Sequence, residues 1–259
     1  MTTIKGNWLF IGTDQRMLEG NSIMNEIGYP SYHYNGDEMS EELQKLLKEV
    51  KPDHLVFPIL QMNSQIPIEL LNKTAKLYVG VTSDDWLSPY RLAGFEIFHY
   101  LKEVRFIWEN ARLTAEAFIQ EYFTDTKSAI AGTHFYIAGF GRVGKMTAEV
   151  LTSLGGSVTI LVRSDEQLGE AEAFRYGTER LAEEPFRSDG ILINTIPAKW
   201  LEVEEGSTLR IFDLSSAPGC LKDNSPDEYY TIHLGLPGKH FPVDAARALT
   251  KAILRMNSG

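Results

Sequence analysis

The sequence contains a single cysteine, Cys220, among its 259 residues, so no disulfide can form within the chain. It has no apolar run near the ~20 residues of a membrane-spanning helix, and residues 1–12 lack the long apolar core of a signal peptide. Basic residues are in deficit, since 25 Lys and Arg stand against 35 Asp and Glu. The resulting net charge of −10 disfavours non-specific binding to nucleic acid or anionic membranes. We therefore expect a soluble cytoplasmic protein without a nucleic-acid or membrane partner.

The common motifs of metal-dependent and nucleophilic catalysis are also missing. The sequence has no HExxH, CxxC or GxSxG stretch, and none of its six histidines has metal-ligand spacing with another. We predict no metal site, and we interpret Cys220 as inert because it has no recognisable base partner. His233 and His240 flank the stretch Gly235-Leu-Pro-Gly238, and whether either one contacts a substrate stays open.

Short apolar runs alternate with amphipathic stretches, a pattern typical of α/β proteins. In the first half we predict strands at residues 8–11, 31–34, 54–60, 77–81, 95–100 and 104–107, with helices at 15–27, 41–50 and 86–93. In the second half we predict strands at 134–138, 157–162, 190–194, 209–214 and 231–234, with helices at 142–154, 166–174 and 242–256.

An amphipathic helix at residues 110–123 leads from the first half into the second. Ala111, Ala115, Phe118 and Tyr122 share one face of it. We interpret it as the connector between two domains. The N-terminal, substrate-side domain is then expected at 1–128, and a cofactor-binding domain with the closing C-terminal helix at 129–259.

The most informative motif is a GxGxxG loop that follows one predicted strand and opens a helix. Its first glycine permits a tight turn, its second lets a pyrophosphate approach the backbone, and its third lets the helix pack close to the strand. The free N–H groups at the start of that helix attract phosphates. Because strand, helix and a second strand all stand at the right distance, we predict a Rossmann dinucleotide site at Gly139, Phe140, Gly141, Arg142, Val143 and Gly144.

The end of the second strand decides between the two nicotinamide cofactors. An acidic residue there normally binds the ribose 2′-hydroxyl of NAD, but this strand ends in Arg163 and Ser164, which suit a 2′-phosphate. We therefore expect NADP, with NAD as the alternative. Asp165 and Glu166 follow directly, and an exposed arginine without a function is the other interpretation.

Two further loops follow predicted strands of the same domain. Thr195, Ile196 and Pro197 follow one strand, and Ser215 and Ser216 follow the next. Ligands bind at the carboxyl edge of such sheets, so we assign these five residues to cofactor binding. Ordinary loop residues are the alternative.

In the first half, Gly12-Thr-Asp14 follows the first strand and precedes a predicted helix. The stretch is either a second anion site or a helix start capped by Asp14. Both interpretations stay open at this point.

Several of these segments, taken in order, resemble the dipicolinate synthase family of spore-forming bacteria, in the first of that enzyme's two subunits. The similar stretches are Phe10-Ile-Gly12-x-Asp14-x-Arg16, Ala138-Gly-Phe-Gly-Arg-Val-Gly144, Ile193-Asn-Thr-Ile-Pro197, Phe212-Asp-Leu-Ser-Ser-x-Pro218-Gly, and Gly235-Leu-Pro-Gly238 with Pro242. The resemblance spans nearly the whole chain. It implies an N-terminal flavodoxin-like domain followed by a C-terminal doubly wound Rossmann domain, similar to the 2-hydroxyacid dehydrogenase superfamily.

The resemblance also implies an activity. The family oxidises a dihydrodipicolinate-type precursor to dipicolinate during sporulation, with a nicotinamide cofactor as hydride acceptor and a second, flavoprotein-like subunit as partner. Its interdomain helix keeps Asn110, Thr114 and Glu116 here, while the proline and glycine of the family's pattern are absent. From position we assign Glu116 as base, Asn110 and Thr114 as hydrogen-bonding groups, and Arg16, next to Asp14, as a carboxylate clamp. Arg112 is a second candidate clamp.

These inferences predict an NADP-dependent oxidoreductase of a small dicarboxylate that forms a homo-oligomer. Whether it acts alone or only with its partner subunit stays open. Two alternatives also stay open. One is an NADP-dependent oxidoreductase of another small carboxylate. The other is a regulatory subunit that binds the cofactor without catalysis.

Overall fold

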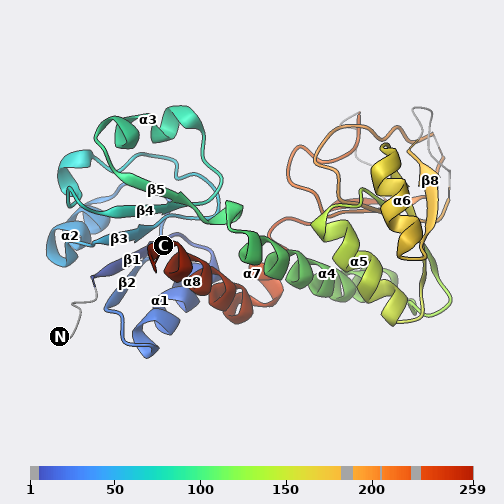
Figure 1. The fold of residues 1–259 in the computed structure, drawn as a ribbon, viewed down its shortest axis with the longest axis horizontal. Coiled ribbons are helices and arrows are strands. Elements are labelled where there is room, and N and C mark those ends of the chain that lie inside the picture. Colours follow the sequence, from blue (N-terminus) through green and yellow to red (C-terminus); the bar gives the residue numbers. More distant parts are fainter. Residues whose placement is uncertain (1–5, 182–188, 205, 223–228, 259) are drawn as a thin grey trace. The chain divides into compact units, whose positions relative to one another are not determined.

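The computed structural model describes residues 6–181, 189–204, 206–222 and 229–258. The chain divides into two compact units, one formed by Met1–Asn110 with Pro237–Gly259 and the other by Ala111–Leu236. Each unit contains one parallel sheet (Figure 1). No helix in the described ranges combines the length and the apolar character that a membrane span requires.

The first unit contains a five-stranded sheet of flavodoxin-like topology. Its strands are β1 (Trp8–Ile11), β2 (Ser31–Tyr34), β3 (His54–Val56), β4 (Lys76–Val79) and β5 (Glu96–His99). They pair in parallel in the order β2-β1-β3-β4-β5. The order reverses between β1 and β3, which is the position where sheets of this kind bind ligands.

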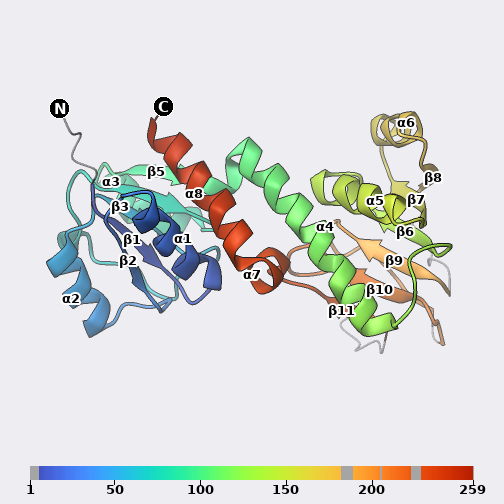
Figure 2. The same ribbon diagram turned by 90° about the horizontal axis from the view of Figure 1, so that it is seen from below.

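Helices cover both faces of this sheet because successive side chains of a strand point to opposite faces. Leu9 and Ile11 belong to the core with α2 (Glu41–Val50) and α3 (Asp84–Leu92). Trp8 and Phe10 belong to the core with α1 (Gln15–Glu26) and α8 (Pro242–Ser258). Figure 2 shows α8 lying beside α1. The unit also contains two 3-10 helices, η1 (Ile68–Leu70) and η2 (Tyr100–Lys102), and all but the first residue of the short α7 (Leu236–His240).

The second unit contains a six-stranded sheet of Rossmann topology. Its strands are β6 (His134–Ala138), β7 (Ser157–Val162), β8 (Gly177–Arg180), β9 (Ile191–Asn194), β10 (Arg210–Asp213) and β11 (Tyr230–Ile232). They pair in parallel in the order β11-β10-β9-β6-β7-β8, the doubly wound arrangement of dinucleotide-binding domains. The helices α5 (Arg142–Ser153) and α6 (Asp165–Ala173) connect β6, β7 and β8. The predicted fold class is confirmed for both units.

Residues 104–107, predicted as a strand, are instead the first turn of α4 (Val104–Thr126). A short apolar run cannot be assigned to helix or strand from periodicity alone. The start of the helix is capped by Glu103, whose carboxylate accepts a hydrogen bond of 2.6 Å from the backbone N–H of Phe106. The connector helix is therefore longer than the predicted 110–123.

The predicted domain boundaries also need correction. The closing helix α8 does not belong to the second unit, because Leu249 and Ile253 are buried against Phe10 and Met17 of the first unit. Most of α4 belongs to the second unit, where Phe118 packs edge-on against Phe212 of β10. The first unit is thus formed by both ends of the chain.

Candidate functional site

The glycine loop connects β6 to α5 and has the geometry of a phosphate-binding turn. Gly139 has φ +91°, a conformation that favours glycine. A Cβ on Gly144 would overlap the backbone carbonyl of Gly139, so the helix approaches the strand more closely than any other residue allows. Gly141 caps α5 without a side-chain hydrogen bond, and a Cβ there would meet nothing within 4 Å. The open space at Gly141 lies where α5 presents its first N–H groups, which fits a dinucleotide pyrophosphate.

The loop after β9 is fixed against the glycine loop. The hydroxyl of Thr195 donates a hydrogen bond of 2.8 Å to the carbonyl of Ala138. A Cβ on Gly139 would lie 2.7 Å from that hydroxyl oxygen, so the two loops are in direct contact. Ile196 is half-buried and Pro197 is exposed. Thr195 therefore shapes the turn, while Ile196 and Pro197 remain accessible to a ligand.

Asp213, at the end of β10, is completely buried, and its carboxylate accepts five hydrogen bonds. The donors are the side-chain amide of Asn194 at 2.8 Å, the backbone N–H and hydroxyl of Ser215 at 2.9 and 2.6 Å, the backbone N–H of Cys220 at 2.7 Å, and the hydroxyl of Tyr230 at 2.9 Å. Buried charge is costly unless it is fully hydrogen-bonded. The network joins the carboxyl ends of β9 and β10 to the start of β11, so it holds the loops that follow β9 and β10.

This network changes how two predicted residues are interpreted. The Ser215 side chain is buried and bound to Asp213, whereas Ser216 is exposed. Ser215 therefore stabilises the loop through its hydrogen bonds to Asp213, and Ser216 is the residue of the two that a ligand can reach. Burial, aided by the charge of Asp213, raises the pKa of the Cys220 thiol well above its usual range, which agrees with an inert cysteine.

Arg163 and Ser164 lie at the end of β7, as predicted. The hydroxyl of Ser164 accepts a hydrogen bond of 3.3 Å from the backbone N–H of Gln167 and so caps α6. The Arg163 side chain is exposed. Arg180 was not among the predicted residues. It lies on the unpredicted strand β8 and donates a hydrogen bond of 3.1 Å to the carbonyl of Arg163.

In the first unit, Asp14 and Arg16 form a close pair at the start of α1. Asp14 caps the helix, and its carboxylate accepts hydrogen bonds of 2.9 and 2.6 Å from the Arg16 guanidinium. Partial burial opposes ionisation of Asp14, but the bonds and charge of Arg16 outweigh it and hold the pKa of the carboxyl below its ordinary value. Gly238 lies directly over the pair, because a Cβ there would be 2.7 Å from the guanidinium Nε.

This placement bears on the predicted carboxylate clamp. Only 6% of the Arg16 side chain is exposed, and two of its nitrogens are bound to Asp14. The capped-helix interpretation of Asp14 is confirmed, because its carboxylate accepts a hydrogen bond from the backbone N–H of Arg16. These contacts place Arg16 as a residue that positions the loop, and its function as a carboxylate clamp stays a prediction.

A pocket of about 300 Å³ lies beside this pair, at the carboxyl ends of β1 and β3 where the strand order reverses. Residues from the loops after β1, β2 and β3 line it, namely Thr13, Asp14, Asp37, Pro58, Ile59, Leu60 and Gln61. It contains two carboxylates and, among the described residues that line it, no basic side chain. Its position suits a small ligand, and its charge suits hydroxyl or amine groups better than carboxylates.

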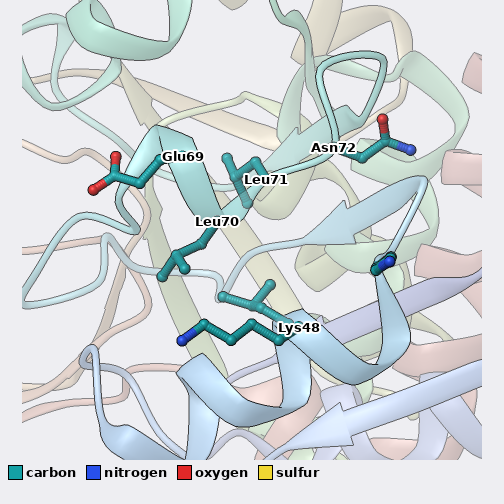
Figure 3. Close-up of a pocket in the computed structure, with 7 residues that line it drawn as sticks. Lys48, Glu69, Leu70, Leu71 and Asn72 are labelled. Atoms are coloured by element: carbon teal, nitrogen blue, oxygen red, sulfur yellow. The ribbon is translucent and has the colours of Figure 1, made fainter.

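A larger pocket, of about 520 Å³, lies between α2 and η1 of the same unit (Figure 3). Leu70 and Leu71 line it together with Lys48 and Glu69. None of its lining residues belongs to the loops at the carboxyl ends of β1 and β3, and no convergent polar group among them points to chemistry there.

The residues assigned on α4 do not form one group. Thr114 is buried, whereas Glu116 is exposed and lies 3.5 Å from Arg112 in an ion pair along the helix. At 100° per residue, positions 114 and 116 face opposite sides of the helix. Asn110 is half-buried. The catalytic roles of Asn110, Thr114 and Glu116 stay predictions, and no single helix face can present all three to one ligand.

Of the two histidines left open, His233 has a mostly buried ring that stacks on Phe212 and lies 3.8 Å from the carboxylate of Glu121. This environment indicates a structural position in the second unit. His240, at the end of α7, is half-buried.

No protein-family model matches this sequence, and no curated protein sequence matches it. Solved structures do match. The chain is similar to a dipicolinate synthase subunit from Bacillus halodurans, with 21% identity, a TM-score of 0.76, and coverage of 100% of this chain and 99% of that one. The Bacillus subtilis protein gives 19% identity and a TM-score of 0.76, with coverage of 100% and 97%. A transhydrogenase from Sinorhizobium meliloti gives 12% identity and a TM-score of 0.66, with coverage of 96% and 92%.

These likenesses extend over the full length of the chain, so they cover both units and not the Rossmann unit alone. The chain thus has the two-domain α/β fold of these proteins.

Proposed function

We propose that this chain is an NADP-dependent oxidoreductase of a small cyclic dicarboxylate, with a reaction like that of dipicolinate synthase. The assignment of a dinucleotide cofactor rests on the glycine loop. There Gly139 and Gly144 permit close packing, and Gly141 leaves space at the start of α5. The assignment of the substrate rests on the motif resemblance, together with similarity to the two dipicolinate synthase structures over nearly their full length and that of this chain.

In this proposal the second unit binds and orients the cofactor. The N–H groups at the start of α5 bind the pyrophosphate. Ile196, Pro197 and Ser216 border the nicotinamide end, and the buried Asp213 network keeps their loops in place. When bound, the cofactor accepts a hydride.

Oxidation of a dihydropyridine ring removes a hydride from one ring carbon and a proton from a neighbouring ring atom. A bound NADP+ would take the hydride and a base of the chain would take the proton, which leaves the ring aromatic. Glu116, an exposed carboxylate on α4, is our candidate base. The Asp14–Arg16 pair positions the loop after β1 without supplying a free cation. A flavoprotein-like subunit is the proposed partner.

One observation favours a second candidate substrate class. The pocket at the β1–β3 edge is lined by Asp14 and Asp37 and by no basic residue of the described chain. An oxidoreductase of a small hydroxyl- or amine-bearing compound would use that pocket more readily than a dicarboxylate would.

A direct assay separates these possibilities. The purified chain is mixed with NADP+ and freshly generated dihydrodipicolinate, with and without a flavoprotein-like subunit, and dipicolinate and NADPH are quantified together. Stoichiometric formation of both supports the proposal. If the chain binds NADP+ but neither dipicolinate nor NADPH forms in either mixture, the dicarboxylate assignment fails. A panel of small alcohols and amines then tests the second candidate.

A further inference from the structure

Arg180 lies on the edge strand β8, beside the end of β7. In the parallel register Ala138 pairs with Leu161, and Leu161 pairs with Glu179. Val162 pairs with Arg180, one residue further toward the carboxyl edge. The glycine loop begins at this same level, since the backbone N–H of Gly139 donates a hydrogen bond of 2.9 Å to the carbonyl of Leu161. Arg180 therefore belongs to the edge of the sheet that carries the cofactor loop.

The Arg180 side chain extends over the turn between β7 and α6. One guanidinium nitrogen donates to the carbonyl of Arg163, and another pairs with the carboxylate of Asp165. The guanidinium remains accessible, with 61% of the side chain exposed. In Rossmann domains the adenosine ribose lies over the end of this strand, where an arginine accommodates a 2′-phosphate. Here the Arg180 guanidinium contacts the backbone of Arg163, 17 residues earlier in the chain, and the Arg163 side chain at that point is exposed.

We infer that Arg180 acts with Arg163 as a two-arginine site for the 2′-phosphate of NADP, and that Asp165 both holds Arg180 over the turn and competes with the phosphate for it. This inference rests on the proposed cofactor function and adds the residue that sets its specificity. An arginine fork matches the oxygens of a phosphate. A nucleotide with a free 2′-hydroxyl offers no anion for it, so Arg180 discriminates between the two cofactors.

The test measures dissociation constants of NADPH and NADH by isothermal titration for the wild-type chain and for Arg180→Gln, Asp165→Asn and Arg175→Gln. Arg175 is the matched control because it is an exposed arginine just before β8, at the opposite end of that strand. We expect Arg180→Gln to weaken NADPH binding by about tenfold and to leave NADH binding unchanged. Asp165→Asn should tighten NADPH binding, and Arg175→Gln should change neither.

Adenosine 2′,5′-bisphosphate and 5′-AMP serve as fragments that lack the nicotinamide. Only the bisphosphate should lose affinity in Arg180→Gln. If Arg180→Gln changes NADPH and NADH binding alike, or changes neither, while the wild type binds them, the inference is overturned and the proposed cofactor function stands. If the wild type binds neither cofactor, both are overturned. Circular dichroism and the melting temperature verify that each variant is folded.

Discussion

The carboxylate of Asp14 accepts hydrogen bonds of 2.9 and 2.6 Å from the guanidinium of Arg16, two residues along the chain. The same carboxylate caps α1 through the backbone N–H of Arg16, at 2.9 Å. Because the arginine is almost entirely buried, Asp14 both begins a helix and neutralises a buried charge. The loop after β1 depends on this pair for its shape.

We expect Asp14→Ala to lower the free energy of unfolding by about 3 kcal/mol, because it leaves the buried Arg16 charge uncompensated. Ser83→Ala is the matched control, since Ser83 caps α3 through the N–H of Trp86 but pairs with no buried charge. The free energy of unfolding of Ser83→Ala should fall by only about 1 kcal/mol. Urea unfolding of both variants measures the difference. Equal losses of about 1 kcal/mol would mean that Asp14 is only a helix cap.

A second prediction concerns His54, whose ring stacks on Trp8 with 4.0 Å between ring centroids and hydrogen-bonds to Tyr78. Burial lowers the pKa of His54 to about 4. The unfolded chain has a histidine pKa of about 6.5, so it binds more protons than the folded chain between these values. The contribution of His54 to the free energy of unfolding is therefore fully present above about pH 6.5. It is lost as the pH falls toward 4, and the loss amounts to about 3 kcal/mol.

The variant His54→Phe keeps an aromatic ring at this position but cannot titrate. Its unfolding free energy, compared with that of the wild type at several pH values from 7 to 4, should show a shallower decline. The comparison uses the pH slope and not the absolute stability, because Tyr78 loses a hydrogen-bond partner in the variant. Identical slopes in the two proteins would show that His54 is not neutral and buried in the native state.

Cys220 offers a third prediction, because it is the only cysteine of the chain and its backbone N–H is bound to Asp213. Its side chain is fully buried and its thiol pKa is raised. We expect the native protein to resist a thiol-specific disulfide reagent at about pH 8, near the pKa of a free thiol. Asp213→Ala leaves several buried donors without an acceptor, so it should cost at least about 3 kcal/mol and make Cys220 reactive. For Asp213→Asn, both the loss of stability and the reactivity of Cys220 should lie between those of the wild type and of Asp213→Ala. Rapid labelling of the wild type would contradict the buried network.

The sequence predicts the geometry of the glycine loop well because its determinants are local. A strand, three glycines and a helix follow one another. Each glycine is needed because of the backbone conformation or a close contact within a few residues. The fully buried strands of both sheets are likewise predictable from their apolar runs. The strand β8 could not be predicted in this way, because Gly177-Thr-Glu-Arg180 is a short polar edge strand without an apolar pattern. Arg180 was missed for that reason.

The remaining differences depend on contacts between segments distant in the chain. The partners of Asp213 come from Asn194, Cys220 and Tyr230, and no local pattern identifies which of these side chains converge. The position of α8 is set by Phe10 and Met17, more than 200 residues away. A sequence can show that a helix is amphipathic, but it does not show which sheet receives its apolar face.

Titration calorimetry of the Gly141→Val variant tests most directly whether the loop at residues 139–144 binds a nicotinamide dinucleotide. Gly141 has an extended backbone at φ −79° and open space at its Cβ position, so the variant should fold as well as the wild type. Gly169→Ala is the control, because Gly169 lies on α6 with equally open space and away from the loop. We predict that the wild type and Gly169→Ala bind NADPH and that Gly141→Val, with an unchanged melting temperature, does not. Normal NADPH binding by Gly141→Val would show that the start of α5 does not bind the dinucleotide.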